Sequence, residues 1–136
     1  MSPEFKIRNL LNANPEIVAL MDRIRGRPLD YPPIFSSTPT DKFFATEGEI
    51  APWIRVTLIP GDGADYADDE RLIEYPRVQV DFWIRKVKTQ DLSELEDLIY
   101  KTLKANNYER YYKSHTPDAD IETLMMVQGN FEGFEI

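Results

Sequence analysis

The residues with the greatest potential for chemistry surround the single histidine, His115. Three carboxylates that could orient an imidazole follow it, namely Asp118, Asp120 and Glu122. A catalytic histidine also needs a nucleophile or a water within hydrogen-bonding distance, and neither a Gly-x-Ser-x-Gly motif nor a second histidine is present. We therefore predict an exposed histidine in a turn, no catalytic residue and no enzyme.

The acidic run from Gly61 to Arg71 is the second candidate, because its carboxylates could hold a cation. Its acidic residues are Asp62, Asp65, Asp68, Asp69 and Glu70. A calcium loop begins with oxygen ligands at alternate positions, but here Asp62 is followed at those positions by Ala64 and Tyr66. We predict an acidic hairpin loop, mobile or functional, without a metal.

Composition excludes several further chemistries. The chain has no cysteine, which removes disulfides, thiolate metal sites and cysteine nucleophiles. Its six glycines are scattered and form no phosphate-binding loop, so we expect no cofactor. Arginines at 23, 25 and 27 could form an anion site, although cations favoured by a helix dipole are the preferred interpretation.

Length and charge indicate one globular domain, residues 1–136. A net charge of −8 argues against specific nucleic-acid binding, because neutralising phosphates needs surplus lysine and arginine. We find no signal-peptide pattern, and the apolar runs are too short to span a bilayer, so we expect a soluble, cytoplasmic protein.

The stretch from Tyr75 to Ala105 organises the rest of the chain. Its first part alternates between apolar and more polar positions, a pattern typical of a half-buried strand. Asp91 and Glu94 then predict a capping box at the start of a helix. The apolar stripe of that helix consists of Leu92, Leu95, Leu98, Ile99, Thr102 and Leu103.

A second strand, Ala51 to Ile59, is expected to pair with the first as a hairpin. Aligning residues whose numbers sum to 136 sets Pro60 opposite Pro76, where neither must donate a ladder hydrogen bond, and an offset of two residues is the alternative that keeps the same faces. The same register pairs Arg55 with Asp81 and Trp53 with Trp83. Both tryptophans then lie opposite the aliphatic face, either at a subunit interface or in a second small core.

The remaining segments complete an α+β fold, in which an antiparallel or mixed sheet with a long hairpin is packed by one long helix and N-terminal helices. Residues 1–27 predict helical structure, with Ser2 and Asn14 as caps and Gly26 at a helix end. Residues 28–50 are rich in loops, with a short edge strand at Ile34–Phe35 and an aromatic pair at Phe43–Phe44, for which cover of the core is preferred over an exposed contact surface. Within the sheet-and-helix region 51–136, strands are expected from Tyr108 to Ser114 and from Thr123 to Phe131. Tyr108 and Tyr112 should then share one face, and Gly129 marks a bulge or a close approach.

The order of these elements and several hydrophobic phrases resemble a known group of proteins. The phrases are Pro52-Trp-Ile-Arg-Val, Tyr75-Pro-Arg-Val-Gln-Val-Asp-Phe-Trp, the leucine-rich helix and Tyr108-Glu-Arg-Tyr-Tyr. They resemble the small tail-completion proteins of long-tailed bacteriophages and prophages, which include tail terminators and head–tail joining proteins. The resemblance covers most of the chain from residue 50 onward.

The resemblance implies a structural virion protein of the tail or neck, assembled in the host cytoplasm as a ring, commonly hexameric, at the end of the tail tube. Its partners would be copies of itself, the major tail tube protein and the head connector protein, and the isolated subunit could be a monomer. We expect the subunits to associate through their sheet edges, the long acidic hairpin and the candidate interface residues Trp53, Trp83, Phe43 and Phe44. The acidic run could line the passage, because negative walls repel the DNA backbone.

Two other functions remain open on the sequence. An acidic adaptor or inhibitor that mimics nucleic acid would need carboxylates along one continuous face, whereas these gather in a loop and in turns. A small ligand-binding module would need a deep pocket at His115 or at the tyrosines 108, 111 and 112. Tyrosines on a strand are more typical of packing and interfaces.

Overall fold

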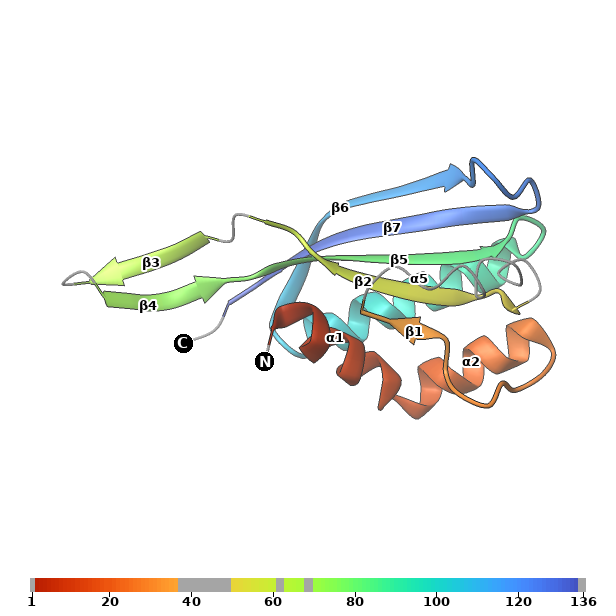
Figure 1. Ribbon diagram of the computed structural model, residues 1–136, viewed down its shortest axis with the longest axis horizontal. Helices are drawn as coiled ribbons and strands as arrows, with labels where there is room; N and C mark the ends of the chain where they lie inside the picture. Colours follow the sequence, from red (N-terminus) through yellow and green to blue (C-terminus); the bar gives the residue numbers. More distant parts are fainter. Residues whose placement is uncertain (1, 37–49, 61–62, 68–69, 135–136) are drawn as a thin grey trace.

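The computed structural model describes residues 2–36, 50–60, 63–67 and 70–134. These residues form an α+β fold with three helices, a five-stranded mixed sheet and a separate two-stranded sheet (Figure 1). In chain order the elements are α1 (Pro3–Asn12), α2 (Pro15–Arg25), β1 (Ile34–Phe35), β2 (Trp53–Leu58), β3 (Gly63–Ala67), β4 (Glu70–Tyr75), β5 (Arg77–Arg85), α5 (Thr89–Lys104), β6 (Tyr108–Pro117) and β7 (Leu124–Gly133).

The main sheet has the order β1-β2-β5-β7-β6, with β1 parallel to β2 and all other neighbours antiparallel. The predicted hairpin register is confirmed, because Trp53 pairs with Trp83, Arg55 with Asp81, and every β2–β5 pair sums to 136. A slip by one residue would turn the apolar side chains to the opposite face. The predicted edge strand at Ile34–Phe35 is also confirmed as β1.

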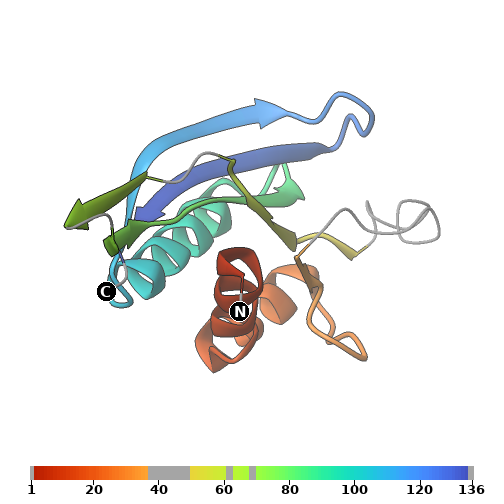
Figure 2. The same cartoon turned by 60° about the vertical axis from the view of Figure 1, so that its left-hand side comes forward.

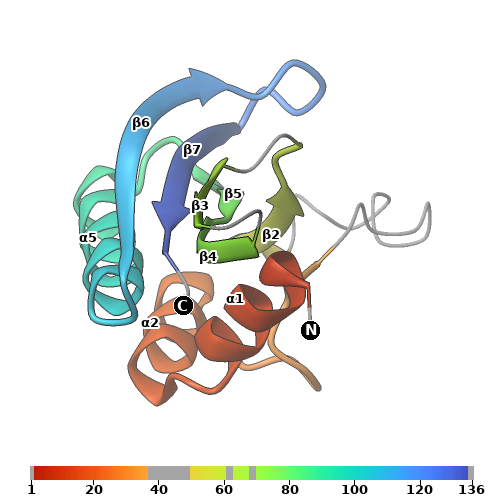
Figure 3. The same ribbon diagram turned by 90° about the vertical axis from the view of Figure 1, so that its left-hand side faces the viewer.

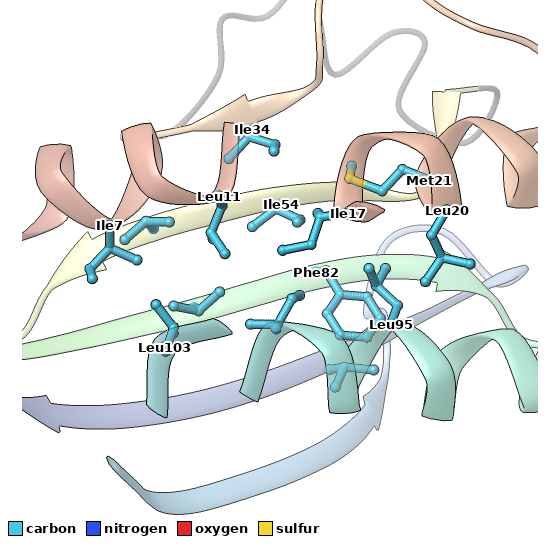
Figure 4. Packing of buried hydrophobic residues seen from close by; sticks show 14 of the residues in the cluster. Ile7, Leu11, Ile17, Leu20, Met21, Ile34, Ile54, Phe82, Leu95 and Leu103 are labelled. Carbon is cyan, nitrogen blue, oxygen red and sulfur yellow. The ribbon is translucent and has the colours of Figure 1, made fainter. Parts of the chain in front are cut away.

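All three helices pack on one face of this sheet, as Figure 2 shows. The core between them is aliphatic apart from Phe82, Phe131 and Tyr108. Figure 4 shows Ile7 and Leu11 of α1 and Leu103 of α5 pointing into the same layer. As predicted, Leu92, Leu95, Ile99 and Leu103 form the buried stripe of α5, and Leu98 is partly buried beside them.

The N-terminal helices follow the predicted start and stop signals, with one exception. Asn14 caps α2, since its side chain accepts hydrogen bonds from the N–H groups of Glu16 and Ile17. Gly26 ends α2 with a φ of 88°, a left-handed conformation that favours glycine. Ser2 precedes α1 but makes no capping hydrogen bond through its side chain. The prediction of a Ser2 cap was therefore wrong.

The long helix begins earlier than the predicted capping box. It starts at Thr89, so Asp91 and Glu94 lie within its first turns rather than around its start. Their carboxylates instead form ion pairs with the guanidinium of Arg23 on α2. The nitrogen–oxygen distance is 3.5 Å for Asp91 and 2.7 Å for Glu94. The start of the helix has no side-chain cap, and the two carboxylates pair with another helix.

The acidic run predicted as a loop contains a second hairpin, named here the arm (β3, β4 and their connection). β2 leads into β3, and β4 leads into β5, so the arm continues two inner strands of the main sheet. It projects beyond the body at one end of the molecule (Figure 1). Its pairing runs from Gly63↔Tyr75 to Ala67↔Glu70, with a register shift between Asp65 and Tyr66.

Strand β6 is longer than predicted and contains a bulge between Arg110 and Tyr112. Before the bulge Tyr108 pairs with Gly133 on the helix-covered face, and after it Tyr112 pairs with Asn130 on the opposite face. Tyr108 and Tyr112 therefore do not share a face, contrary to the prediction. Gly129 is a close-approach point, because a Cβ there would lie 2.9 Å from the ring of Phe131.

Replacing Gly133 by Ala is expected to destabilise the chain by about 1–3 kcal/mol, because the added methyl group overpacks the core. Its Cβ would lie 2.6 Å from the ring of Tyr108, which is 3% exposed and has little room to move. Urea unfolding of the variant measures the loss. In a double variant with Tyr108→Leu the clash should be relieved, so simple addition of the two effects would contradict this explanation.

Candidate functional site

The histidine lies in β6, not in the predicted exposed turn. His115 Nε2 is 2.7 Å from a carboxylate oxygen of Glu96 on α5, and the two side chains are 42% and 17% exposed. Ser114 and Thr116 precede and follow it on the strand, so their hydroxyls lie on the opposite face. This pair has an orienting carboxylate but no hydroxyl nucleophile from its own strand, and it connects the edge strand to the long helix.

The space beside this pair is too small for a substrate. A cavity of about 10 Å³ lies between α5 and the sheet, bordered by Glu96, Arg110 and Gly129. That volume holds about one water molecule. Among the described residues, no group of three or more histidine and acidic side chains could hold a metal ion.

The two tryptophans form a second small core on the face of the sheet opposite the three helices. Their rings stack with centroids 3.9 Å apart and an interplanar angle of 7°, and Phe35 meets Trp53 edge-on. Trp53 and Trp83 are only 1% and 6% exposed. The other members of this cluster are Ile50, Ala51 and Leu124, with Leu29, Phe35, Ile121 and Met126 packed around them. Little indole surface is left for a neighbouring subunit, and the interface role of the tryptophans stays a prediction.

A polar network continues from the tryptophans along the same face. Asp81 is fully buried and accepts hydrogen bonds from Arg55, at 3.0 Å, and from the amide of Gln79. The guanidinium of Arg55 also lies 4.9 Å from the centroid of the Trp83 ring. The predicted Arg55–Asp81 pair is therefore confirmed, and the cation–π contact couples it to the tryptophans.

Asp118, considered above as an orienting group for the histidine, has a different role. It accepts a hydrogen bond from the indole N–H of Trp83 at 3.0 Å. Its other oxygen accepts from the backbone N–H groups of Asp120 and Ile121. Asp118 therefore shapes the turn between β6 and β7 and holds it against the second core.

Arg25 connects the end of α2 to residues 50–52, a role that could not be predicted from the sequence. Its side chain is 1% exposed and donates hydrogen bonds to the carbonyls of Ile50 and Pro52, at 2.8 and 3.0 Å, and to that of Arg27. Burial lowers the pKa of the Arg25 guanidinium, and Asp22 opposes that change. Hydrogen bonding to Glu94 and its charge raise the pKa of the exposed Arg23. Both arginines are thus occupied by groups of the chain itself, which removes them from an anion site.

The remaining candidates lie in or near the arm and in residues 37–49. Asp65 lies in β3 and Glu70 in β4, whereas Asp62, Asp68 and Asp69 are outside the described residues. Phe43 and Phe44 are also outside them. Sheet edges were predicted as contact surfaces, but the sequence did not indicate which strand forms the long edge; it is β6, where Tyr111 and Tyr112 are 53% and 51% exposed. The tyrosines of this strand already indicated packing or an interface. The bulge that places Tyr108 and Tyr112 on opposite faces of the sheet was not predictable.

Comparisons with known proteins place the fold but no family. No family model matches the sequence, and no curated protein matches it. A chain in the structure described as the virion of a native gene transfer agent (GTA) particle has the same fold, with a TM-score of 0.61 and 7% sequence identity. The match covers 98% of this chain and 93% of that chain. No helix in the described part of the chain is long and apolar enough to cross a membrane.

Proposed function

We propose that this chain is a structural subunit of a phage, prophage or phage-like particle, and that it completes the tail. The observation that carries the proposal is the fold shared with a chain of a gene transfer agent virion across nearly the full length of both. The proposed partners are copies of the chain itself, the major tail tube protein and the head connector protein. In this role it forms a ring at the end of the tail tube, in the virion.

The chemistry of the described residues supports binding rather than turnover. Glu96, the partner of His115, borders a cavity that holds about one water. By contrast, the arm and the long free edge of β6 are surfaces of the kind that subunits use for contact. The acidic composition of the arm is compatible with a passage through which DNA slides, since like charges repel the phosphate backbone.

The test is assembly with tail tubes, observed by negative-stain electron microscopy and by size-exclusion chromatography with light scattering at several concentrations. We expect rings or capped tube ends with the full chain. A variant in which residues 61–75 are replaced by an Asn-Gly turn should fold, because the arm forms its own sheet, and should lose capping. A chain that neither self-associates nor caps tubes would refute the proposal.

A further inference from the structure

In the described part of the chain, β6 forms the longer of the two edges of the main sheet. The strand is ten residues long, is the last in the order β1-β2-β5-β7-β6, and most of its residues are exposed. The opposite edge is different, because β1 has two residues and the carbonyl of Ile34 accepts a hydrogen bond from Arg8 of α1. Figure 3 shows β6 on the outside of the sheet. A long strand of this kind can accept a further strand through its backbone groups.

This edge is held firmly in place from the inside. Near its start the hydroxyl of Tyr100 on α5 donates to Glu109 at 2.5 Å, and Arg110 lies over the Tyr100 ring at 4.6 Å. Near its end His115 contacts Glu96 of the same helix. A strand fixed at both ends loses little conformational freedom when another strand is added, which favours binding.

The arm has the complementary property. It is a two-stranded sheet apart from the main sheet, and a ribbon of two strands is marginally stable without a partner. In the described residues its sheet has no third strand, although the base of β4 approaches β7. It gains most from pairing with an edge that is already ordered.

The charges of the two segments are opposite. The arm and its flanks, residues 61–75, contain six acidic residues and one arginine. Strand β6 contains Arg110, Lys113 and His115 against one acidic residue, Glu109, in a chain whose net charge is −8. Exposed tyrosines beside Lys113 add the aromatic surface that protein interfaces favour.

We propose that the outer edge of β6 receives the arm of a second copy of this chain as an added strand. This inference rests on the proposed assembly function and names the surfaces that build it. Because the two surfaces differ, the contact is head-to-tail, and it generates a ring when its rotation closes. The bulge and Lys113 protect the edge from less specific pairing, because both are common means of blunting edges.

The absence of cysteine allows a direct test by cross-linking. One preparation carries Thr116→Cys on β6, and a second carries Ala64→Cys on β3 or Glu74→Cys on β4. We expect a short bismaleimide to join the mixed preparations into heterodimers. The matched control replaces Thr116→Cys by Val87→Cys, at a residue 81% exposed in the connection between β5 and α5, and should give only background.

Charge reversal supplies the second measurement. Lys113→Glu should reduce the cross-link yield by about tenfold, which corresponds to a loss of about 1.4 kcal/mol of binding free energy. A partner that carries Asp65→Lys in its arm should restore the yield. Arg27→Glu, an equal charge change at an exposed residue after α2, should leave the yield unchanged. No heterodimer above the Val87→Cys control, or no rescue, would overturn the inference.

The result also separates this inference from the proposed function. Capped tubes without the arm–β6 cross-link would refute the docking edge and leave the tail role intact. A strong cross-link in a chain that never caps tubes would support the docking edge and refute the tail role.

Discussion

Replacing Trp53 by Ala is expected to lower the free energy of unfolding by about 4 kcal/mol, the cost of removing a fully buried tryptophan. The ring is 1% exposed, stacks on Trp83 and meets Phe35 edge-on. Its removal would leave a cavity in the second core and would loosen the support of Arg55 above Trp83. Chemical denaturation followed by circular dichroism measures the loss.

The control for this variant is Tyr112→Ala, which removes a half-exposed aromatic ring from the same face of the sheet. We expect a change below about 1 kcal/mol there, as is usual for surface positions. The pair distinguishes the two roles considered for Trp53. A Trp53→Ala chain that keeps its stability but loses assembly would contradict the second core and favour the interface.

The second large effect is expected from Arg25→Met, which keeps an unbranched side chain and removes the guanidinium. The carbonyls of Ile50, Pro52 and Arg27 would each lose a donor. The contacts to Ile50 and Pro52 are partly buried, and an unpaired buried acceptor costs about 1–3 kcal/mol, whereas the exposed carbonyl of Arg27 can bind water, so we expect a loss of about 3 kcal/mol. Thermal and urea unfolding both report it.

Arg23→Met is the matched control, since it removes a cation two residues earlier on the same helix. Arg23 is 60% exposed and pairs with Asp91 and Glu94 at the surface, so its loss should cost less than about 1 kcal/mol. Arg25→Lys should fall between the two, because one ammonium group cannot reach all three carbonyls. Equal losses for Arg23→Met and Arg25→Met would show that charge at the helix end, not the carbonyl contacts, is responsible.

Sequence patterns predicted the structure correctly where the determining residues lie within one or two neighbouring segments. Alternation along β2 and β5 and the positions of two prolines led to the correct register, because a slip would have exposed every apolar side chain. The cap at Asn14 and the left-handed residue Gly26 were also predictable, since each is a local backbone requirement. The α+β class followed from these elements.

The failures share a physical cause, which is competition from residues distant in sequence. Asp91 and Glu94 resemble a capping box, but Arg23 of another helix binds them instead. The bulge in β6 depends on its pairing with β7, so the faces of Tyr108 and Tyr112 could not be read from their spacing. His115 met its partner Glu96 only because that strand folds back along α5.

The candidate surfaces were predicted in part for the same reason. Their placement opposite the aliphatic core was correct for both tryptophans, but the groups that cover them, including Ile50 and Ile121, come from connecting segments. The acidic run was recognised, yet its strands were not, because its hydrophobic content is low and Asp is unfavourable in strands. The roles of the arm and of β6 await the cross-linking test.

The arm lies between the two inner strands β2 and β5 in the chain, which has a mechanical consequence. Tension applied at the tip would run along two inner strands, parallel to their axes, and the ladders to β1 and β7 would resist it in shear. Many hydrogen bonds then bear the force together, whereas peeling an edge strand breaks them one after another. An assembly whose subunits are held by the arm would therefore resist pulling along this direction.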